Sequence, residues 1–434
     1  MMNKQKVLTI ATLVCLTIGT FAGCGAEVPK GTNVSTLQQG SIKQLQKNNW
    51  SENNYNKINK LIVENGINSP GYNKDKRPYL VSDWDNTTAF NDAEETLLMY
   101  QLRNLEFKMT PEKFAQVIRT NIPKDNFAKE CNNKDGKPVN IDLIAQDINS
   151  DYEYLYKNYK GLAGEKSLDE IKVTPEYQNF VAKTRYLYEA IGESFSSDIS
   201  YPWVTYLFTG MNEKEARILA RKSLDFNLAD TVSKETIQSL SSAPGKAGVV
   251  SVTVTHGLRS FQEQQDLYKT LMSNGIDVYI CSASFVDLVK EFASNPNYGY
   301  NIPEQNVLAM ELERDDNGII KNEFRKGYDQ TQSVGKTKTI EKFLVSKYGY
   351  EPIMVSGDSD GDVYMLKDFK TTKLGLVLNR VKGGKTGEIS KIASETIGKD
   401  NEKYLLQGID ENLGQFRPSE KSVLFNQHEE KLIK

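Results

Sequence analysis

Two aspartates at the end of a short apolar run are the residues of this sequence best suited to chemistry. Asp83 and Asp85 are separated by one residue and follow residues 79–82, which are apolar enough for a short buried strand. A pair of carboxylates at such a place is costly unless an opposite charge compensates it. A divalent cation is the usual compensation, and the carboxyl edge of a parallel sheet is where such sites form. The pair therefore predicts a metal-dependent reaction centre.

Three later segments each present a polar group at the end of an expected strand or at the start of an expected helix. Ser282 follows strand 277–281, Asp358 follows strand 352–356, and Lys336 begins a helix between them. The carboxyl ends of parallel strands meet at one edge of a sheet. We therefore expect a hydroxyl, an ammonium and further carboxylates to lie around the aspartate pair.

This set of groups suits phosphoryl transfer through an aspartyl phosphate. A phosphoryl group carries charged oxygens that cations and hydrogen-bond donors must meet. In this interpretation Asp83 is the nucleophile, and Asp85 protonates the leaving alkoxide and later activates water. Asp83 and Asp358 would ligate Mg²⁺, which favours oxygen ligands. Lys336 would neutralise the nucleophile and the phosphate, and Ser282 would donate to a phosphate oxygen. Lys338, two residues further along the same helix, is the alternative cation.

Composition argues against several other kinds of protein. The chain has only two histidines, His256 and His428, which argues against a histidine-based metal site and against a serine–histidine triad. The formal net charge is −3 and no basic block stands out, which argues against a nucleic-acid partner. Cys131 and Cys281 are isolated, so the chain carries no disulfide framework beyond its first 24 residues.

The elements needed to position these groups are unevenly spread along the chain. Helical spacing is clear before the first strand, in residues 50–65, and again over much of 96–248, where no alternating strand is visible. Within that region we expect four helices, at 111–122, 144–160, 175–195 and 213–224. Strands and helices alternate beyond a linker-like stretch at 241–245, which predicts a parallel sheet. The simplest arrangement adds strand 79–82 to that later sheet, with the helical region inserted between.

The N-terminus is expected to be a targeting segment. Lys4 and Lys6 precede an apolar run over residues 7–22 that ends in Phe-Ala-Gly-Cys. This pattern is typical of a signal peptide, and Ala-Gly-Cys resembles a bacterial lipobox in which Cys24 is lipidated. We assign residues 1–23 to a lipoprotein signal peptide and 24–45 to a flexible tether, which implies an extracytoplasmic protein anchored to the bacterial membrane. Plain secretion and an uncleaved anchor are the alternatives.

Four short stretches in order carry a resemblance to a known family. They are Asp-Trp-Asp-Asn-Thr from Asp83, the strand-end Ser282, the helix-opening Lys336, and Gly-Asp-Ser-Asp-Gly-Asp from Gly357. Together they resemble the motifs of the haloacid dehalogenase superfamily of phosphatases. The resemblance implies an α/β fold: a three-layer, Rossmann-like haloacid dehalogenase core with a large helical cap inserted between the first and second motifs. It divides the chain into core residues 46–95, a helical cap over 96–248 and core residues 249–434.

A closer resemblance covers most of the chain from about residue 50 to about residue 419. The stretches AEETLLMY, YPWVTYLFTGM, NGIDVYICSAS and LLQGIDENLGQFRPS resemble bacterial phosphorylcholine phosphatases and their secreted relatives. In that family an acidic residue shortly after the first motif contacts the choline ammonium, and Glu95 stands at the matching position. A carboxylate with aromatic neighbours suits a quaternary ammonium. A plain helix N-terminal charge is the alternative for Glu95, and Glu94 is expected to face solvent.

The candidate site residues follow from the motifs and the resemblance. The expected catalytic residues are Asp83, Asp85, Ser282 and Lys336. The expected Mg²⁺ ligands are Asp83, Asp85, Asp358 and Asp362, with Asp360 the weaker substitute for Asp362. The expected substrate-binding residues are Thr87, Glu95, Ser282, Ala283 and Lys336. Tyr201, Trp203 and Tyr206 are interpreted as core aromatics.

The function these residues predict is Mg²⁺-dependent hydrolysis of a small phosphate monoester, with phosphorylcholine as the expected substrate. Another small ester, such as phosphoserine or phosphoethanolamine, is one alternative. A surface lipoprotein that binds a ligand without turnover is another, although binding alone does not require a pair of reactive aspartates. No protein partner is predicted.

Overall fold

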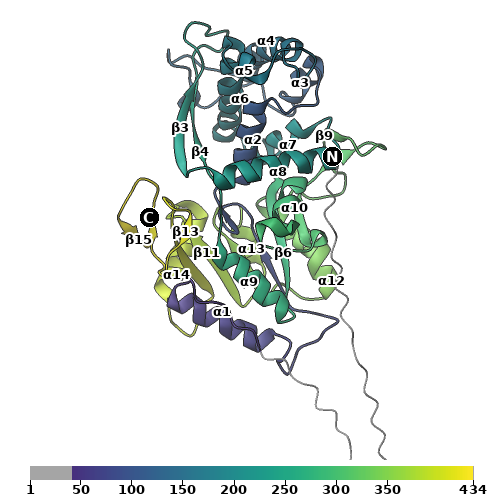
Figure 1. The fold of residues 1–434 in the computed structure, drawn as a ribbon. Helices are drawn as coiled ribbons and strands as arrows, with labels where there is room; N and C mark the ends of the chain where they lie inside the picture. Colours follow the sequence, from purple (N-terminus) through teal and green to yellow (C-terminus); the bar gives the residue numbers. More distant parts are fainter. Residues whose placement is uncertain (1–41, 434) are drawn as a thin grey trace, which may run out of the picture. The chain divides into compact units, whose positions relative to one another are not determined.

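The first strand of the central sheet, β1 (Tyr79–Ser82), lies between two strands from the second half of the chain (Figure 1). In this computed structural model, which describes residues 42–433, β1 pairs in parallel with β6 (Asp277–Phe285) and β10 (Met354–Gly357). The strand order is β15-β14-β12-β11-β10-β1-β6-β7, with β13 paired to β12. The other strands of this sheet are β7 (Val307–Met310), β11 (Leu374–Asn379), β12 (Tyr404–Asp410), β13 (Gln415–Phe416), β14 (Ser422–Val423) and β15 (Glu430–Lys431). The prediction that the first strand joins the later sheet is confirmed.

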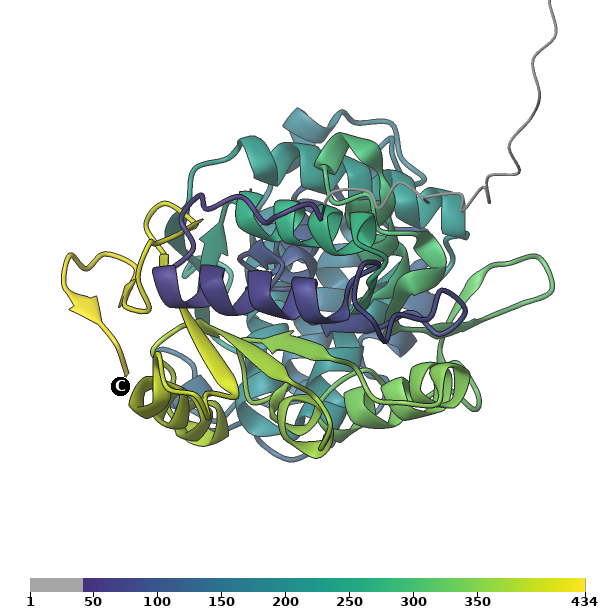
Figure 2. The same cartoon turned by 90° about the horizontal axis from the view of Figure 1, so that it is seen from below.

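Helices cover both faces of this sheet. Successive strand residues face opposite sides, so Leu80 packs in one apolar core and Val81 in the other. The first face carries α1 (Glu52–Asn65), α9 (Gln262–Ser273) and α10 (Val286–Ser294). The second carries α11 (Val334–Ile340), α13 (Val363–Asp368) and α14 (Gly384–Thr396). A π-helical turn (Glu341–Val345) and α12 (Ser346–Tyr348) continue α11. Figure 2 shows α1 and α14 on opposite sides of the strands. The three-layer α/β class is confirmed.

A group of helices is inserted between β2 (Ala89–Phe90) and the later core (Figure 1). They are α2 (Ala93–Asn104), α3 (Pro111–Val117), α4 (Ile141–Asn158), α5 (Leu168–Lys172), α6 (Pro175–Ser194), α7 (Ser197–Thr205) and α8 (Glu213–Ala229). The predicted starts at Pro111 and Pro175 are correct, and a threonine caps each helix by accepting a backbone N–H. Stacked aromatic rings hold the group together; the ring centroids of Phe114 and Tyr152 lie 4.0 Å apart.

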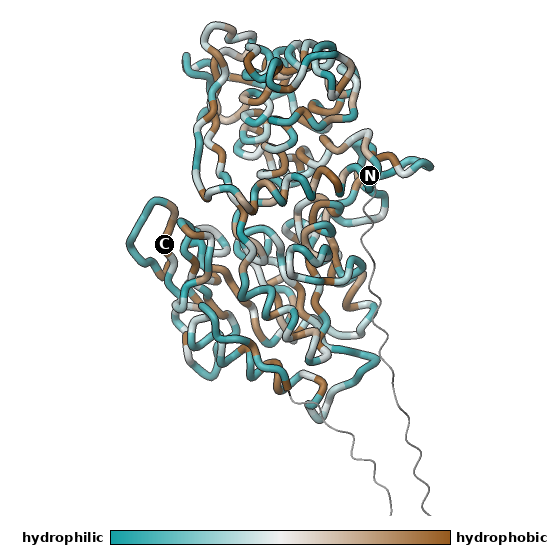
Figure 3. Tube along the Cα trace, viewed as in Figure 1, coloured by the Kyte–Doolittle hydropathy of each residue, from teal (hydrophilic) through white to brown (hydrophobic). Residues whose placement is uncertain are grey.

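The expectation that residues 96–248 contain no strand is wrong. β3 (Ser233–Gln238) pairs along its whole length with β4 (Ser251–His256) as an antiparallel hairpin, and the expected linker at 241–245 lies in its connection. Figure 3 shows β3 as a mostly hydrophilic segment beside the more apolar β4. The strand was missed because its residues, Ser-Lys-Glu-Thr-Ile-Gln, are largely exposed and lack the alternation that marks a half-buried strand.

Other differences concern the ends of elements. Residues 307–324 do not belong to a single sheet, because β7 joins the main sheet in parallel and β8 (Leu312–Arg314) pairs with β9 (Ile320–Phe324) as a separate hairpin. The small strand β5 (Arg259–Ser260) pairs with β2. Cys131 and Cys281 are buried free thiols, in line with the prediction that they form no disulfide.

The N-terminal assignments fall mostly outside the described residues. The predicted signal peptide, Cys24 and nearly all of the predicted tether lie in residues 1–41. At the described end of that tether the chain already packs on the core, since Leu45 is buried and Asn274 hydrogen-bonds both the N–H and the carbonyl of Lys43. Within residues 42–433 no helix combines the length and the apolar character needed to cross a bilayer.

Candidate active site

In the turn after β1 the side chains of the two aspartates point in one direction and the side chain of Trp84, which lies between them in sequence, points in another. The carbonyl of Trp84 accepts the backbone N–H groups of Thr87, Thr88 and Ala89, at 3.3, 2.8 and 3.1 Å, which folds the chain back on itself. The Trp84 ring is completely buried and packs edge-on against Phe292 and Tyr300. Because side chains alternate in direction along the chain, Trp84 packs in the core, whereas Asp83 and Asp85 both line a pocket at the edge of the sheet.

A buried lysine joins two of the predicted carboxylates. Lys336 Nζ lies 2.5 Å from Asp83 Oδ1 and 2.7 Å from Asp362 Oδ1. Lys336 is buried on α11 whereas Lys338 is exposed, so Lys336 is the cation at the site. Burial alone acts to lower the pKa of Lys336, but Asp362 and Asp83 raise it above its usual value. The ammonium thus remains charged and offsets part of the negative charge.

Three carboxylates converge on one point beside this lysine. Ligand oxygens of Asp83, Asp358 and Asp362 lie within 4.8 Å of one another, and all three residues are buried. Asp362 also accepts the backbone N–H groups of Asp358 and Ser359, so the loop after β10 is closed around it. Burial and the charge of Asp362 raise the pKa of Asp83 to about 7, although Lys336 acts in the opposite direction. Lys336 offsets part of the charge of Asp83 and Asp362, and the all-oxygen set of three carboxylates fits a hard cation such as Mg²⁺.

Two other predicted ligands lie elsewhere. Asp85 is not in the group of three, because its carboxylate accepts the N–H of Ala93 at 2.8 Å and the hydroxyl of Ser284 at 2.6 Å. Asp360 accepts the N–H and the hydroxyl of Thr386, which directs it toward α14. The structure therefore brings together Asp362, rather than Asp360, with the other two carboxylates.

Asp85 has the environment of an acid rather than of a permanent anion. Burial raises the pKa of Asp85 to about 7, although the hydrogen bonds from Ser284 and from the Ala93 N–H act to lower it. A carboxyl group of this kind can hold a proton near neutral pH and release it, as acid–base catalysis requires. Asp83 and Asp85 are thus placed in different surroundings by the same turn.

The remaining predicted residues flank the pocket at different depths. Thr87 is completely buried and donates its hydroxyl to Asp83 Oδ2 at 3.0 Å, which orients that carboxylate. Ser282 is also completely buried, and its hydroxyl accepts the N–H of Ser284. Ala283 and Ser284 line the pocket, whereas Thr87 and Ser282 lie outside its lining.

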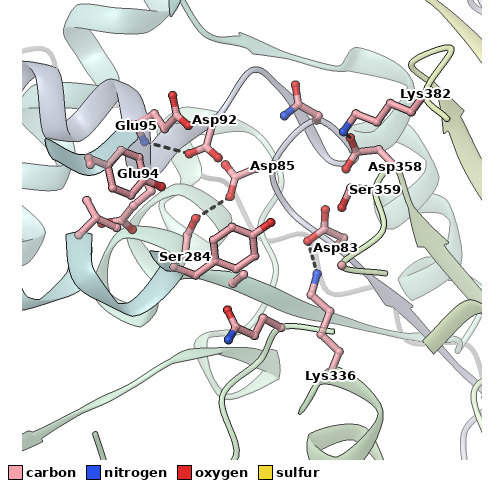
Figure 4. A pocket seen from close by; sticks show the side chains of 17 residues that line it. Asp83, Asp85, Asp92, Glu94, Glu95, Ser284, Lys336, Asp358, Ser359 and Lys382 are labelled. Carbon is pink, nitrogen blue, oxygen red and sulfur yellow. Dashed lines mark hydrogen bonds and ion pairs between the residues drawn. The ribbon is translucent and has the colours of Figure 1, made fainter. Parts of the chain in front are cut away.

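The pocket holds about 200 Å³ and continues away from Asp83 toward α2 and α6. Its far side is acidic and aromatic, with the side chains of Asp92, Glu94, Glu95, Tyr188 and Tyr201. Figure 4 shows Asp92, Glu94 and Glu95 on the α2 side of Asp85, and Lys336 and Lys382 on the side of Asp83. One end of the pocket is therefore suited to an anion and the other to a cation.

Glu95 lies at this acidic end but already has a cationic partner. Arg185 on α6, with a side chain only 2% exposed, pairs with Glu95 at 2.9 Å and with Glu189 at 3.1 Å. Burial raises the pKa of Glu95 and Arg185 opposes that shift. Because the guanidinium contact is direct and 37% of the Glu95 side chain is accessible, we treat this carboxylate as ionised.

Two expectations about neighbouring residues are wrong. Glu94 does not face solvent: it is 4% exposed, accepts the N–H of Phe285 at 2.8 Å, and lines the pocket. The start of α2 is enclosed on more than one side, so adjacent helical residues are both covered. Tyr201 is not a core aromatic, since it is 38% exposed and lines the pocket, whereas Trp203 and Tyr206 are buried as predicted.

Several residues at the site were not predicted. Ser284 lies two positions after Ser282, and same-face spacing in a strand that continues to Phe285 would have suggested it. Asp92 is the N-cap of α2 and accepts the N–H of Glu95, which the Asp-x-x-Glu spacing could have indicated. Arg185 and Lys382 carried no signal, because only the tertiary arrangement brings them to the site.

These features agree with the resemblance that the sequence motifs carry. The parallel sheet, the carboxylate pair after its first strand, the helical insertion that follows, and the lysine and second carboxylate loop occur in the order that the resemblance to the haloacid dehalogenase superfamily implies. No protein-family model matches the chain.

Two particular relatives were found. A conserved protein of unknown function from Anaerococcus prevotii DSM 20548, known from its crystal structure, is 39% identical, with a TM-score of 0.83 over 89% of this chain and 99% of that one. The chain belongs to the same family as that protein. It is also 30% identical over 112 residues to the phosphorylcholine phosphatase of Pseudomonas aeruginosa PAO1, a match that spans 26% of this chain and 29% of the length of that enzyme.

Proposed function

We propose that this chain is a phosphoric monoester hydrolase that works through an aspartyl phosphate. The proposal rests on one observation: Asp83 and Asp85, which belong to the same turn after β1, have different surroundings. Asp83 lies among carboxylates and beside a buried ammonium, whereas Asp85 is held apart by Ser284 and the N–H of Ala93. A nucleophile and a separate acid are what a two-step displacement at phosphorus needs.

In the first step an oxygen of Asp83 attacks phosphorus and the bond to the ester oxygen breaks. Asp85 gives its proton to the departing oxygen, so an alcohol leaves instead of an alkoxide. The hydrogen bond from Thr87 to Asp83 Oδ2 leaves Oδ1, beside Lys336, as the oxygen on the cationic side. Lys336 stabilises the negative charge of the phosphoryl group.

In the second step water attacks the same phosphorus atom and the bond to Asp83 breaks. Asp85, now ionised, takes the proton of that water and returns to its acid form. The products are inorganic phosphate and regenerated carboxylate. The raised pKa of Asp85, about 7, lets one group serve both steps. Asp83, Asp358 and Asp362 would hold a Mg²⁺ ion, which supplies positive charge to phosphoryl oxygens when it is bound.

The acidic far end of the pocket favours a cationic leaving group. Burial raises the pKa of Glu94 to about 8, so the negative charge at this end comes from Glu95 and Asp92, and the guanidinium of Arg185, which pairs with Glu95, is shared with Glu189. Tyr188 and Tyr201 also line this end, and aromatic rings suit an ammonium that carries methyl groups. Phosphorylcholine is therefore the substrate we propose, and the partial match to an enzyme named for that activity supports it.

Phosphoethanolamine is the alternative that the same end of the pocket allows. A primary ammonium needs hydrogen-bond acceptors, and the carboxylates of Asp92 and Glu95 could supply them. Phosphoserine fits less well, since its own carboxylate would face these acidic groups. A binding protein without turnover would have no use for the separately held Asp85.

A panel of phosphate monoesters tests the proposal. Purified protein is incubated with phosphorylcholine, phosphoethanolamine, phosphoserine and an uncharged aryl phosphate, with Mg²⁺ and with EDTA, and released phosphate is measured. We expect turnover with Mg²⁺, loss of turnover with EDTA, and the highest kcat/KM for phosphorylcholine. Binding of phosphorylcholine without phosphate release from any ester would overturn the hydrolase.

We also propose that the protein is extracytoplasmic and held at the membrane by a lipid on Cys24. The Ala-Gly-Cys ending of the apolar N-terminal run supports this. Metabolic labelling with a fatty-acid analogue should mark the wild-type protein and not a Cys24→Ala variant. Equal labelling of both would rule out Cys24 as the anchor.

A further inference from the structure

A strained turn follows β11 at the edge of the pocket. Val381 has a φ of 51°, in the left-handed region that β-branched residues almost never occupy. The side chain of Asn379 holds it there: Asn379 Oδ1 accepts the N–H of Val381 at 3.0 Å, and its amide donates to the carbonyls of Glu420 and Leu432. Such conformations persist when the surroundings enforce them, and they gather at functional sites.

The strained turn presents two cations to one carboxylate. Arg380 and Lys382 flank Val381, and their nitrogens lie 3.4 and 3.0 Å from the same oxygen, Asp358 Oδ2. The two cations are held differently. Arg380 is fixed by Glu411 at 2.7 Å, whereas within residues 42–433 the ammonium of Lys382 pairs with Asp358. Lys382 is thus the cation that can move without breaking another ion pair.

Lys382 also lines the pocket, and its side chain is 40% exposed. Figure 4 shows Lys382 and Lys336 approaching Asp358 and Asp83 from opposite sides. The site therefore has two lysines with unlike surroundings, one buried between two carboxylates and one at the open side of the pocket. An ordinary surface ion pair contributes little, and would not explain a strained turn that is anchored by a buried asparagine.

We propose that Lys382 is a phosphate-binding residue: when the metal ion binds, its ammonium leaves Asp358 and contacts the phosphoryl group of the substrate. This proposal rests on the proposed hydrolase function. Without the metal, the ammonium of Lys382 neutralises Asp358. A divalent cation on Asp358 repels that ammonium. The flexible stem of lysine then lets the ammonium turn into the pocket, where it meets oxygens of the phosphoryl group.

The exchange couples metal and phosphate binding. Lys382 competes with Mg²⁺ for Asp358, so its removal should strengthen Mg²⁺ binding to the free protein. Its removal should also weaken the binding of inorganic phosphate once Mg²⁺ is present, because one cation of the phosphate site is missing. These opposite effects distinguish the exchange from a simple loss of positive charge at the pocket edge.

Isothermal titration calorimetry on the full chain tests this with Lys382→Met, and with Lys382→Gln as a second variant. We expect the Kd for Mg²⁺ alone to fall about fivefold and the Kd for inorganic phosphate with saturating Mg²⁺ to rise about fivefold or more. Lys385→Met is the matched control, because Lys385 lies three residues further on, contacts Tyr364 and does not line the pocket. Both constants should be unchanged in that variant.

A second measurement follows the same exchange without a ligand titration. The melting temperature of Lys382→Met should be lower than that of the wild type in EDTA and should match it in excess Mg²⁺. Unchanged or weaker Mg²⁺ binding in both Lys382 variants would overturn the competition, and unchanged phosphate binding would overturn the exchange. Neither result depends on turnover, so failure of the hydrolase proposal would be seen separately, as absence of phosphate release by the wild type.

Discussion

Arg185 and Glu95 form an ion pair of 2.9 Å between α6 and α2 at the end of the pocket far from Asp83. The arginine is almost completely buried and also pairs with Glu189. It therefore fixes Glu95, which lines the pocket around Asp83, and Glu189, which lines a neighbouring pocket that Glu95 also borders. Glu95 is therefore a pre-positioned group rather than a free surface charge. Its position is set by a helix some ninety residues away in the sequence.

Replacement of Glu95 should affect cationic substrates selectively. In Glu95→Gln the pocket loses a negative charge while Arg185 stays, so we expect KM for phosphorylcholine to rise about tenfold, equivalent to about 1.4 kcal/mol. KM for an uncharged aryl phosphate should change little. Steady-state kinetics on the two substrates checks this. Glu189→Gln is the matched control, because it removes the other partner of Arg185 and does not line the pocket around Asp83. Equal changes in KM for both substrates would show that Glu95 does not contact the leaving group.

Replacement of Asp83 should abolish hydrolysis without unfolding the protein. Asp83→Asn replaces the nucleophilic carboxylate with a neutral amide, and we expect kcat to fall by about 10³-fold or more. Lys336 keeps its contact with Asp362, and one of three crowded carboxylates is lost, so the melting temperature in EDTA should not fall appreciably. Phosphate release and thermal unfolding measure the two effects. Wild-type turnover by a folded Asp83→Asn protein would contradict the aspartyl-phosphate route.

The parts of this site that could be predicted from the sequence are those encoded in short contiguous stretches. Asp83 follows β1 directly, Asp358 and Asp362 share one loop after β10, and Lys336 opens α11. Each is marked by its position at the end of a buried strand or the start of a helix. The same local patterning predicted the parallel sheet and the starts of α3 and α6.

The parts that could not be predicted depend on packing between distant segments. Nothing near Arg185 in sequence indicates Glu95 as its partner, and Lys382 reaches Asp358 because Val381 adopts an unusual conformation. Solvent exposure of Glu94 was misjudged for the same reason, since helical periodicity describes a single covered face and α2 is enclosed more widely at its start. The polar strand β3 could not be predicted because its sequence lacks the alternation of apolar and polar residues that marks a half-buried strand.

The pH dependence of the rate should report Asp85. Its pKa of about 7 means that the fraction able to protonate the leaving group falls as pH rises through 7, so the first step slows on the alkaline side. The hydroxyl of Ser284 stabilises the ionised form of Asp85 and lowers its pKa. Ser284→Ala should therefore move the alkaline limb of kcat/KM to higher pH, by about one unit at most. Ser359→Ala, which removes a hydroxyl bound to Asp362 instead, is the control. A shift to lower pH in Ser284→Ala would contradict the assignment.

The stability of the folded protein should depend on pH through Glu94. Burial, reinforced by Asp92, raises the pKa of Glu94 to about 8, although the bond from the Phe285 N–H acts to lower it, and Glu94 Oε1 has no hydrogen-bond partner among the described residues. A carboxyl group with a raised pKa in the folded state holds its proton more tightly there than in the unfolded chain. It is neutral in both states well below pH 4.5 and must be buried as an anion above about pH 8. Its penalty therefore grows as pH rises between those values.

Glu94→Gln removes this titration while it keeps an oxygen to accept the Phe285 N–H. Between pH 5 and pH 8 we expect the free energy of unfolding to fall less in the variant than in the wild type, by about 1–3 kcal/mol. Urea unfolding at the two pH values measures the difference. Glu64→Gln, at an exposed position on α1, serves as the control and should follow the wild type. A variant that loses more stability than the wild type on going to pH 8 would show that Glu94 is buried as a stabilised anion.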